Sequence, residues 1–356
     1  MSTIILTIST EVFYTKIALS KDESIVYHRD INHSKEDFIL LDNNMEQLPF
    51  RRDAIMNQLR YDAVDLKSIQ YVVAEGGLLK PCEAGVYEID KSMVGDLIDG
   101  VGGEDVLNMS GLLAFTIASI LRVRSLVVDP ASVDERSELA RFFAHPITRK
   151  KSLFHALIHK YLSEKYAKSL NEHCDNMNII FCHVADRNVS VAAHKKGRVV
   201  DVNQAYMGFG PMGFFETGTM PVSNVVDMLL KKHYTKDEML KLINRNATFH
   251  SYLSTNSCDE IMSSLKNDNK TKIILEVMAY QIAKEIASHY VTLDGEIDAI
   301  ILSGKIFSDN CFFKYLSKRI ENLAPIKSYP KDYTVEALVY NVLQFVNGGR
   351  KIKTYA

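Results

Sequence analysis

Glycine turns that could hold phosphate groups follow two of the apolar, strand-like runs in this chain. Gly76 and Gly77 close one run, and Gly304 closes another. Backbone N–H groups in such turns can reach phosphate oxygens, because no Cβ blocks the approach. Two further strand ends carry a polar residue, Asp129 before a proline and His183. These residue types would suit the binding of a phosphorylated ligand.

A strand–turn–strand–turn–strand pattern occurs twice, at residues 4–28 and at residues 178–205. Neither first turn contains glycine: one reads STEVFYTK from Ser9, and the other reads HVADRN from His183. The two glycine-closed strands follow these units in the same order. Two matches in one order indicate an internal duplication.

The remaining periodicity predicts an α/β protein built from two domains, each a mixed sheet flanked by helices. Another buried strand is expected at residues 124–129. Helices are expected at residues 38–59, 106–122, 150–168, 223–231, 236–243, 259–265, 272–290 and 335–346. We place the first domain at residues 1–150 and the second at residues 151–334. The segment 335–356 is a candidate return to the first domain.

Composition fits an ordinary globular protein of two domains, with 356 residues, 47% apolar and 24% charged. A formal net charge of −2 gives no electrostatic basis for binding nucleic acid. No apolar run reaches membrane-spanning length and no leader precedes the first strand, so we expect no membrane partner and a cytoplasmic location.

The cysteines and histidines predict neither a disulfide framework nor a metal site. The five cysteines are scattered and odd in number, which favours reduced thiols. Cys182 lies in an apolar strand and is expected in the core. Five histidines lack metal-ligand spacing. They are His33, His145, His155, His159 and His173.

Several segments together resemble butyrate kinase. They are HPITRKKSLFHAL, AAHKKGRVVDVNQA, GTMP, VMAYQIAKEIA and the strand end VVDP. That family belongs with acetate kinase in the acetate/sugar kinase–Hsp70–actin (ASKHA) superfamily. The resemblance covers nearly the whole chain. It implies two duplicated actin/ribonuclease H-like domains with a cleft between them. It also implies a homo-oligomer, and a reaction in which ATP and Mg2+ phosphorylate a short-chain carboxylate such as butyrate.

The resemblance implies roles for individual positions. Asp129 matches a catalytic aspartate, and His183 matches a histidine that faces the transferred phosphoryl group. Substrate-binding positions are Glu75, Gly76, Gly77 and Glu216. Nucleotide and phosphate positions are Ser9, Thr15, Lys16, Asn188, Gly304 and Lys305.

Seven motifs or positions depart from the family's pattern. The family's first turn reads NPGSTSTK and its second HxGGG, and both have lost their glycines here. Two family arginines, one at the substrate and one at the transition state, are Glu75 and Glu216 in this chain. The family's LGTSD, TGG and PGSNEE become LSTNS, SGK and PKDYTV, and the last change removes an acidic group expected near the metal. We expect Phe13, Tyr14 and the pair Phe214-Phe215 to fill space that a nucleotide would take.

These changes predict a butyrate kinase relative with impaired or absent activity, kept as a partner, scaffold or regulator. At ~4 Å and an effective dielectric of ~20, each arginine-to-glutamate reversal turns roughly 4 kcal/mol of attraction for an anion into repulsion. Two alternatives stay open. One is an active kinase with an altered substrate or nucleotide mode, because Asp129 and His183 remain. The other is a protein- or small-ligand-binding regulator. Asp129 also has a structural interpretation as a turn former, and His183 as part of a hydrogen-bond network.

Overall fold

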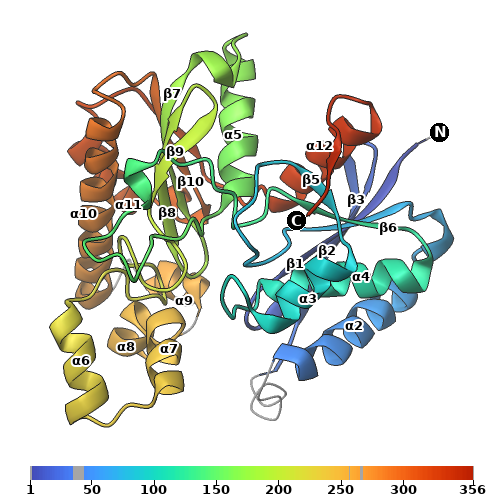
Figure 1. Ribbon diagram of the computed structural model, residues 1–356, viewed down its shortest axis with the longest axis horizontal. Helices are drawn as coiled ribbons and strands as arrows, with labels where there is room; N and C mark the ends of the chain where they lie inside the picture. The colour runs from blue at the N-terminus through green and yellow to red at the C-terminus, as the bar shows by residue number, and fades with distance from the viewer. Residues whose placement is uncertain (1, 35–43, 256, 265–267, 356) are drawn as a thin grey trace. The chain divides into compact units, whose positions relative to one another are not determined.

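The computed structural model describes residues 2–34, 44–255, 257–264 and 268–355, which form two compact units (Figure 1). The first unit contains the described residues up to Asp134, Ala156–Ile158 and those from Tyr333 onward. The second contains Glu135–His155 and the described residues of His159–Asp332. The domain boundary near residue 150 and the cleft implied by the resemblance stay predictions.

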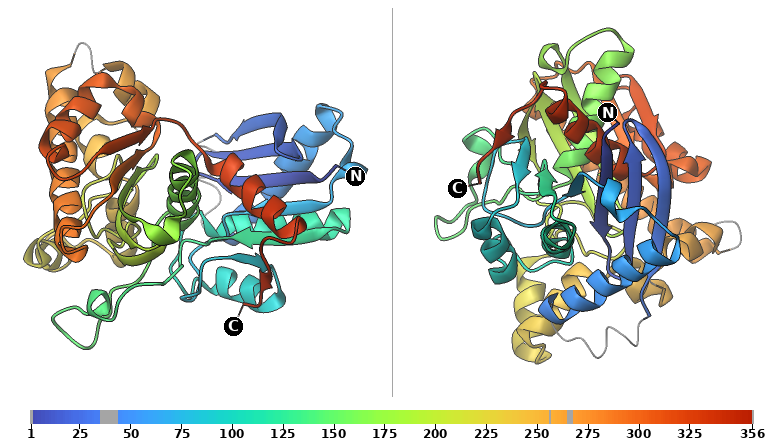
Figure 2. Two further views of the ribbon diagram at one scale, coloured as in Figure 1. Left: turned by 90° about the horizontal axis from the view of Figure 1, so that it is seen from above. Right: turned by 90° about the vertical axis from the view of Figure 1, so that its right-hand side faces the viewer.

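The first unit is built on a seven-stranded sheet in the order β12-β5-β6-β4-β1-β2-β3. Its strands are β1 (Ile4–Thr10), β2 (Tyr14–Lys21), β3 (Ser24–Asn32), β4 (Tyr71–Ala74), β5 (Val86–Glu88), β6 (Arg124–Val128) and β12 (Ile352–Lys353). Its helices are α2 (Asn44–Tyr61), α3 (Lys91–Asp99), α4 (Asn108–Leu121) and α12 (Thr334–Val346), with a 3-10 turn at Leu66–Ser68. Helices α4 and α12 both pack on β1, β4 and β6, and Figure 2 shows them on opposite faces of the sheet.

The second unit is built on a five-stranded sheet in the order β11-β10-β7-β8-β9. Its strands are β7 (Asn178–Val184), β8 (Val189–Lys195), β9 (Arg198–Val202), β10 (Ala299–Ser303) and β11 (Ile326–Tyr329). Its helices are α5 (Ala156–Ser169, of which 156–158 cluster with the first unit), α6 (Val222–Lys231), α7 (Lys236–Asn244), α8 (Thr248–Leu253), α9 (Cys258–Ser264), α10 (Asn269–Thr292) and α11 (Asn310–Ile320). Short 3-10 turns lie at Leu139–Arg141, Cys174–Asn176 and Lys305–Ser308.

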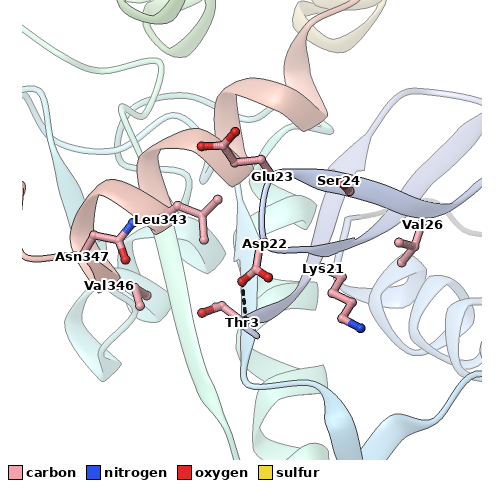
Figure 3. Close-up of a pocket in the computed structure, with 9 residues that line it drawn as sticks. All are labelled: Thr3, Lys21, Asp22, Glu23, Ser24, Val26, Leu343, Val346 and Asn347. Atoms are coloured by element: carbon pink, nitrogen blue, oxygen red, sulfur yellow. Dashed lines mark hydrogen bonds between the residues drawn. The ribbon is translucent and has the colours of Figure 1, made fainter. Parts of the chain in front are cut away.

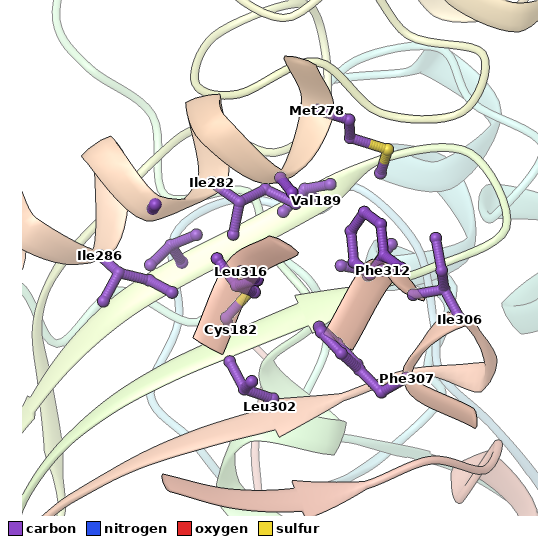
Figure 4. Close-up of a cluster of buried hydrophobic side chains, with 14 of the residues drawn as sticks. Cys182, Val189, Met278, Ile282, Ile286, Leu302, Ile306, Phe307, Phe312 and Leu316 are labelled. Atoms are coloured by element: carbon purple, nitrogen blue, oxygen red, sulfur yellow. The ribbon is translucent and has the colours of Figure 1, made fainter. Parts of the chain in front are cut away.

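Strand alternation gives the second sheet one apolar face and one face of mixed polarity. Because successive side chains point to opposite faces, Val189 and Val191 point to the core under α10 and α11, together with the predicted core residue Cys182 (Figure 4). Helix α10 reaches this core with apolar residues three and four positions apart, among them Met278 and Ile282. The opposite face, toward α5, carries both polar and apolar side chains, such as Ser190 of β8 and Phe181 of β7.

The two sheets repeat one topology, which confirms the predicted duplication. In each, three antiparallel strands (β1–β3, β7–β9) are followed by two strands that join in parallel (β4 and β6, β10 and β11). Even the irregularity in the second hairpin recurs. The register shifts between Leu19 and Ser20 in β2 and between Ala193 and His194 in β8, two residues before each strand ends.

Most predicted elements are present, with shifted ends. The helix predicted at 150–168 begins at Ala156, because residues 150–155 form an irregular segment. The first residues of the helix predicted at 38–59 and the last of that at 259–265 lie outside the described residues, as does Asn256 of the LSTNS motif. Our sequence analysis missed α3, α8, α11 and the short strands β5, β11 and β12. In the described part of the chain, no helix is long and apolar enough to cross a membrane.

Candidate functional site

The β1–β2 turn is held by a buried arginine from α2. Arg51 is fully buried and donates to the carbonyl oxygens of Glu11 (3.0 Å), Val12 (2.9 Å) and Tyr14 (3.2 Å). It also donates to the hydroxyl of Thr15 across 2.9 Å. The guanidinium therefore fills the side of the turn on which three carbonyl groups converge. Sequence reasoning missed Arg51, whose only signal was an arginine within a predicted helix.

Thr15 and Lys16, both predicted to bind nucleotide, have different surroundings. Thr15 is fully buried, and its hydroxyl also lies 2.8 Å from Nε2 of His33. Lys16 is half-buried, with its ammonium 6.0 Å from the centre of the Tyr14 ring. Thr15 is therefore committed to internal hydrogen bonds, and Lys16 lies beside an aromatic ring in the same strand.

Ser9 and Glu75, predicted at separate subsites, contact each other at the carboxyl ends of two neighbouring strands. Strands β1 and β4 are parallel neighbours, so their carboxyl ends lie side by side. The Ser9 hydroxyl donates to Oε1 of Glu75 across 2.5 Å. Ser9 and Glu75, both predicted substitutions, are thus hydrogen-bond partners of one another.

Gly76 and Gly77 are required by the packing of α4. Gly76 has φ +94°, and its carbonyl accepts hydrogen bonds from Ser110 Oγ and from the N–H of Gly111, each at 3.0 Å. A Cβ on Gly77 would lie 2.8 Å from the Cα of Asn108. Helix packing therefore explains this glycine pair without a ligand.

Asp129 lies just after β6 in the left-handed backbone region, with φ 39°. Its side chain is buried, and Oδ1 accepts a 2.7 Å hydrogen bond from the N–H of Gly85. Oδ2 lies 3.9 Å from Nη1 of Arg350. An aspartate tolerates this conformation better than most residues, so the turn-forming interpretation also fits.

His183 is the second-last residue of β7 and lies among other histidines of the second unit. Its Nδ1 lies 3.2 Å from the hydroxyl of Ser303, and its ring is edge-on to that of His155 at 4.8 Å. Burial lowers the pKa of His183 to about 4, although the charges of Asp332 and Asp186 oppose this shift. At neutral pH the ring is therefore uncharged.

The β7–β8 turn contains a buried ion pair that sequence reasoning missed. Asn188 Nδ2 donates to Oε1 of Glu216 across 3.0 Å, and Arg187 Nη1 lies 3.9 Å from the same oxygen. All three residues are buried. The resemblance predicts that Glu216 replaces a family arginine, and the structure shows that Arg187 of the turn itself supplies the neighbouring cation.

The segment from Gly213 to Glu216 packs directly on this turn. The N–H groups of Phe215 and Glu216 donate to the carbonyl of Arg187 at 3.1 and 3.3 Å. A Cβ on Gly213 would lie 2.2 Å from that same oxygen. Phe214 and Phe215 are buried in the hydrophobic core of the unit. Their predicted occupation of nucleotide space stays a prediction.

Gly304 and Lys305 follow β10. Gly304 has φ +130°, and a Cβ there would lie 2.1 Å from the carbonyl oxygen of Val184. The adjacent strands thus require glycine. Lys305 is exposed at the start of a 3-10 turn.

A buried histidine cluster between α5 and the sheet was not predicted as a unit. His155 and His159 contact Ser190, and His159 contacts His194. His289 from α10 lies on the opposite face, with Nε2 3.0 Å from the carbonyl of Val191. Burial lowers the pKa of His155, His159 and His194 well below the usual value. The spacing of four residues between His155 and His159 was the available signal.

A cavity of about 670 Å3 lies elsewhere in the first unit, between the β2–β3 hairpin and the end of α12 (Figure 3). It is lined by Thr3, Lys21, Asp22, Glu23, Ser24, Val26, Leu343, Val346 and Asn347. None of the predicted site residues lines it. Among the described residues, no group of three or more His, Cys, Asp or Glu side chains could hold a metal ion.

Comparisons with known proteins agree with the fold. The acetokinase family model matches residues 141–322. Butyrate kinase 2 of Clostridium acetobutylicum is 35% identical over 352 residues, which cover 99% of each chain. A probable butyrate kinase of Listeria monocytogenes is 34% identical and matches over 100% of both chains.

Solved structures show the same architecture at low identity. Acetate kinase from Porphyromonas gingivalis superposes with a TM-score of 0.76, 14% identity and coverage of 97% of this chain and 100% of that one. A propionate kinase from Francisella tularensis gives a TM-score of 0.73 at 14% identity, covering 95% and 98%. These likenesses confirm the predicted two-domain ASKHA fold. Butyrate kinases are similar to this chain over its whole length. This chain belongs to the acetokinase family.

Proposed function

We propose that this chain keeps the butyrate kinase fold but has little or no kinase activity. It would transfer phosphoryl groups from ATP to short-chain carboxylates, butyrate included, slowly or not at all. The observation that carries the proposal is the buried carboxylate of Glu216. It accepts a hydrogen bond from the side-chain amide of Asn188 and lies beside the guanidinium of Arg187. Donors that an anionic ligand would need at this turn are thus already directed at a side chain of the protein.

The β1–β2 turn supports the same proposal, because its residues do not fit a nucleotide phosphate. A phosphate cradle needs converging N–H groups. Here carbonyl groups of Glu11, Val12 and Tyr14 converge on Arg51 instead. Phosphoryl transfer depends on positioning and on neutralising charge around the transferred group. Neither turn supplies that arrangement for ATP and Mg2+.

A steady-state assay tests the proposal directly. The chain would be incubated with ATP, Mg2+ and butyrate, acetate or propionate, and acyl phosphate would be trapped as the hydroxamate. Butyrate kinase 2 of Clostridium acetobutylicum serves as the positive control. We expect a rate at least a hundredfold below the control, since losing one positioned donor alone typically costs about that much. A rate within tenfold of the control would overturn the proposal.

Nucleotide binding is a separate measurement. A ligand that binds the native state must raise its melting temperature. We expect no shift at millimolar ATP with Mg2+. A clear shift without turnover would instead favour a nucleotide-binding regulator.

The remaining role would then be non-catalytic, as a partner, scaffold or regulator in the cytoplasm. A homo-oligomer, dimer or larger, is part of this proposal, and light scattering after size-exclusion chromatography tests it. A monomer at micromolar concentration would remove the oligomer from the proposal and leave the activity question untouched.

A further inference from the structure

Strand β3 is an outer edge of the seven-stranded sheet, where it pairs with β2 on one side only. It runs for nine residues, from Ser24 to Asn32, and contains neither proline nor lysine. All of its residues except Tyr27 and Ile31 are exposed. A long edge strand presents unpaired N–H and C=O groups, so it can act as a template for another strand.

The equivalent strand of the second unit, β9, is covered by another segment of the chain. Strand β9 is only five residues long. The N–H of Ser137 donates to the carbonyl of Val200 across 2.8 Å, and the N–H of Val199 donates to the carboxylate of Glu135 across 2.9 Å. Of the two duplicated edge strands, the described residues therefore cover β9 and leave β3 uncovered.

The ladder between β2 and β3 shows which backbone groups of β3 face outward. The N–H of His33 donates to the carbonyl of Phe13, so the odd-numbered residues of the regular ladder bond to β2. By alternation, His28 and Asp30 direct their N–H and C=O groups away from the sheet. In agreement, Arg29 Nη1 donates to the carbonyl of His28 across 3.0 Å. That is the one hydrogen bond that the described residues make on the outer side of β3.

An antiparallel second copy of β3 complements this edge when the two-fold axis passes through Arg29. His28 of each copy then lies opposite Asp30 of the other, and each such pair exchanges two N–H···O bonds. The imidazole can donate to the facing carboxylate whether the ring is neutral or charged. An axis at Asp30 would instead place two carboxylates opposite each other, which is unfavourable.

The other face of the same register brings Tyr27 of one copy beside Ile31 of the other. Arg29 lies beside its own copy on this face, where Asp62 at 3.0 Å balances the charge of each guanidinium. The guanidinium must leave the carbonyl of His28 when the strands pair, because that carbonyl then accepts an N–H of the other copy.

We propose that the outer edge of β3 binds a second copy of this chain, so that two seven-stranded sheets become one continuous sheet. The inference rests on the homo-oligomer of the proposed function and names the surface that forms it. The edge selects an identical strand because its outward backbone groups and its His28 and Asp30 side chains are complementary to themselves about a two-fold axis.

A cysteine at the axis tests the register. Residues opposite each other in a non-hydrogen-bonded pair have Cα atoms about 4.5 Å apart, which is within disulfide range. Arg29→Cys, in a Cys311→Ser background that removes the exposed native thiol, should therefore link most chains in oxidised glutathione. Asn32→Cys in the same background is the matched control and should stay unlinked, because its two copies lie at opposite ends of the paired strands.

Asp30→Pro tests the pairing without a disulfide. It removes an outward N–H and no hydrogen bond to β2, which an edge strand tolerates. We expect this variant to lose the dimer that light scattering detects for the wild-type chain at the same micromolar concentration.

The outcomes separate this inference from the proposed oligomer. A wild-type oligomer whose Arg29→Cys variant does not link would overturn the pairing at β3 and leave the oligomer standing, even if Asp30→Pro fails to fold. An unchanged mass for a folded Asp30→Pro protein would have the same meaning. A monomeric wild-type chain with no link in Arg29→Cys would overturn both.

Discussion

Arg51 donates from Nη1 to the hydroxyl of Thr15 across 2.9 Å, and the remaining donors of its guanidinium reach carbonyl groups of the β1–β2 turn and the side chain of Gln47. A charged side chain is buried only when its donors find partners. Here the partners are backbone carbonyls that would otherwise converge unsatisfied. The turn and α2 are therefore stabilised as one arrangement.

Replacing Arg51 with methionine should lower the free energy of unfolding by about 3 kcal/mol. The variant loses several charged hydrogen bonds and leaves buried carbonyls without donors. The midpoint of urea unfolding, at unchanged m, measures the effect. Arg52→Met is the control, because the Arg52 guanidinium is only half-buried and pairs with the exposed Asp53. Equal losses for both variants would contradict the assigned role of Arg51.

Gly304→Ala should destabilise the second unit by about 2 kcal/mol or more. The new Cβ would lie 2.1 Å from the Val184 carbonyl oxygen, and the backbone has φ +130°, so strand β7 would have to move. Gly95→Ala in α3 is the opposite case. A Cβ there meets nothing within 4 Å, and alanine favours the helix by up to about 1 kcal/mol. The melting temperature should fall for Gly304→Ala and rise for Gly95→Ala.

The buried histidines should make stability fall as the solution is acidified. His183 and His289 each have a pKa lowered to about 4 in the folded chain by burial, against about 6.5 when unfolded. Their contribution is fully present above pH 6.5. It is lost as pH falls toward 4, because only the unfolded chain takes up protons there. Each histidine then costs about 1.4 kcal/mol per pH unit.

Urea titrations at pH 7.5, 6.0 and 5.0 measure this slope. His289→Gln should reduce this slope by about 1.4 kcal/mol per pH unit, which is the contribution of one proton. Stability that stays flat from pH 7.5 to 5.0 would show that these rings are not held neutral.

The Arg187–Glu216 pair should show strong energetic coupling. A double-mutant cycle with Arg187→Met and Glu216→Gln should give about 1–3 kcal/mol, because both side chains are buried and each single change leaves a buried partner. The exposed pair of Asp227 and Lys231 on α6, at 2.9 Å, should show no measurable coupling. A Glu216 cycle that also gives none would remove the ion pair as a reason for the buried glutamate.

Local patterns carried most of the fold. Apolar runs and helical spacing, which are properties of neighbours in sequence, predicted the strand triplets, the helices α4 and α10, and strand β10. Two missed helices had local signals in their N-caps. Asp90 accepts from the N–H of Met93, and Asp309 accepts from those of Cys311 and Phe312.

The family relationship was also determined by the sequence, and the resemblance predicted substitutions at Glu75 and Glu216. The partners of these two residues were not. Ser9 meets Glu75 only because β1 and β4 are parallel neighbours 66 positions apart. Arg187 meets Glu216 only because Gly213 lets a later segment approach the β7–β8 turn.

What the sequence by itself determined was the family and the positions at which we predict a departure from its phosphate-binding pattern. Only the tertiary structure decided how the replacements are satisfied: Arg51 on three carbonyls, Asn188 and Arg187 on Glu216, and a serine shared by two histidines. The physical reason is that buried polar groups need partners wherever the chain supplies them. Such partners come from strands and helices that are far apart in sequence, so a local sequence pattern cannot predict which residues will pair.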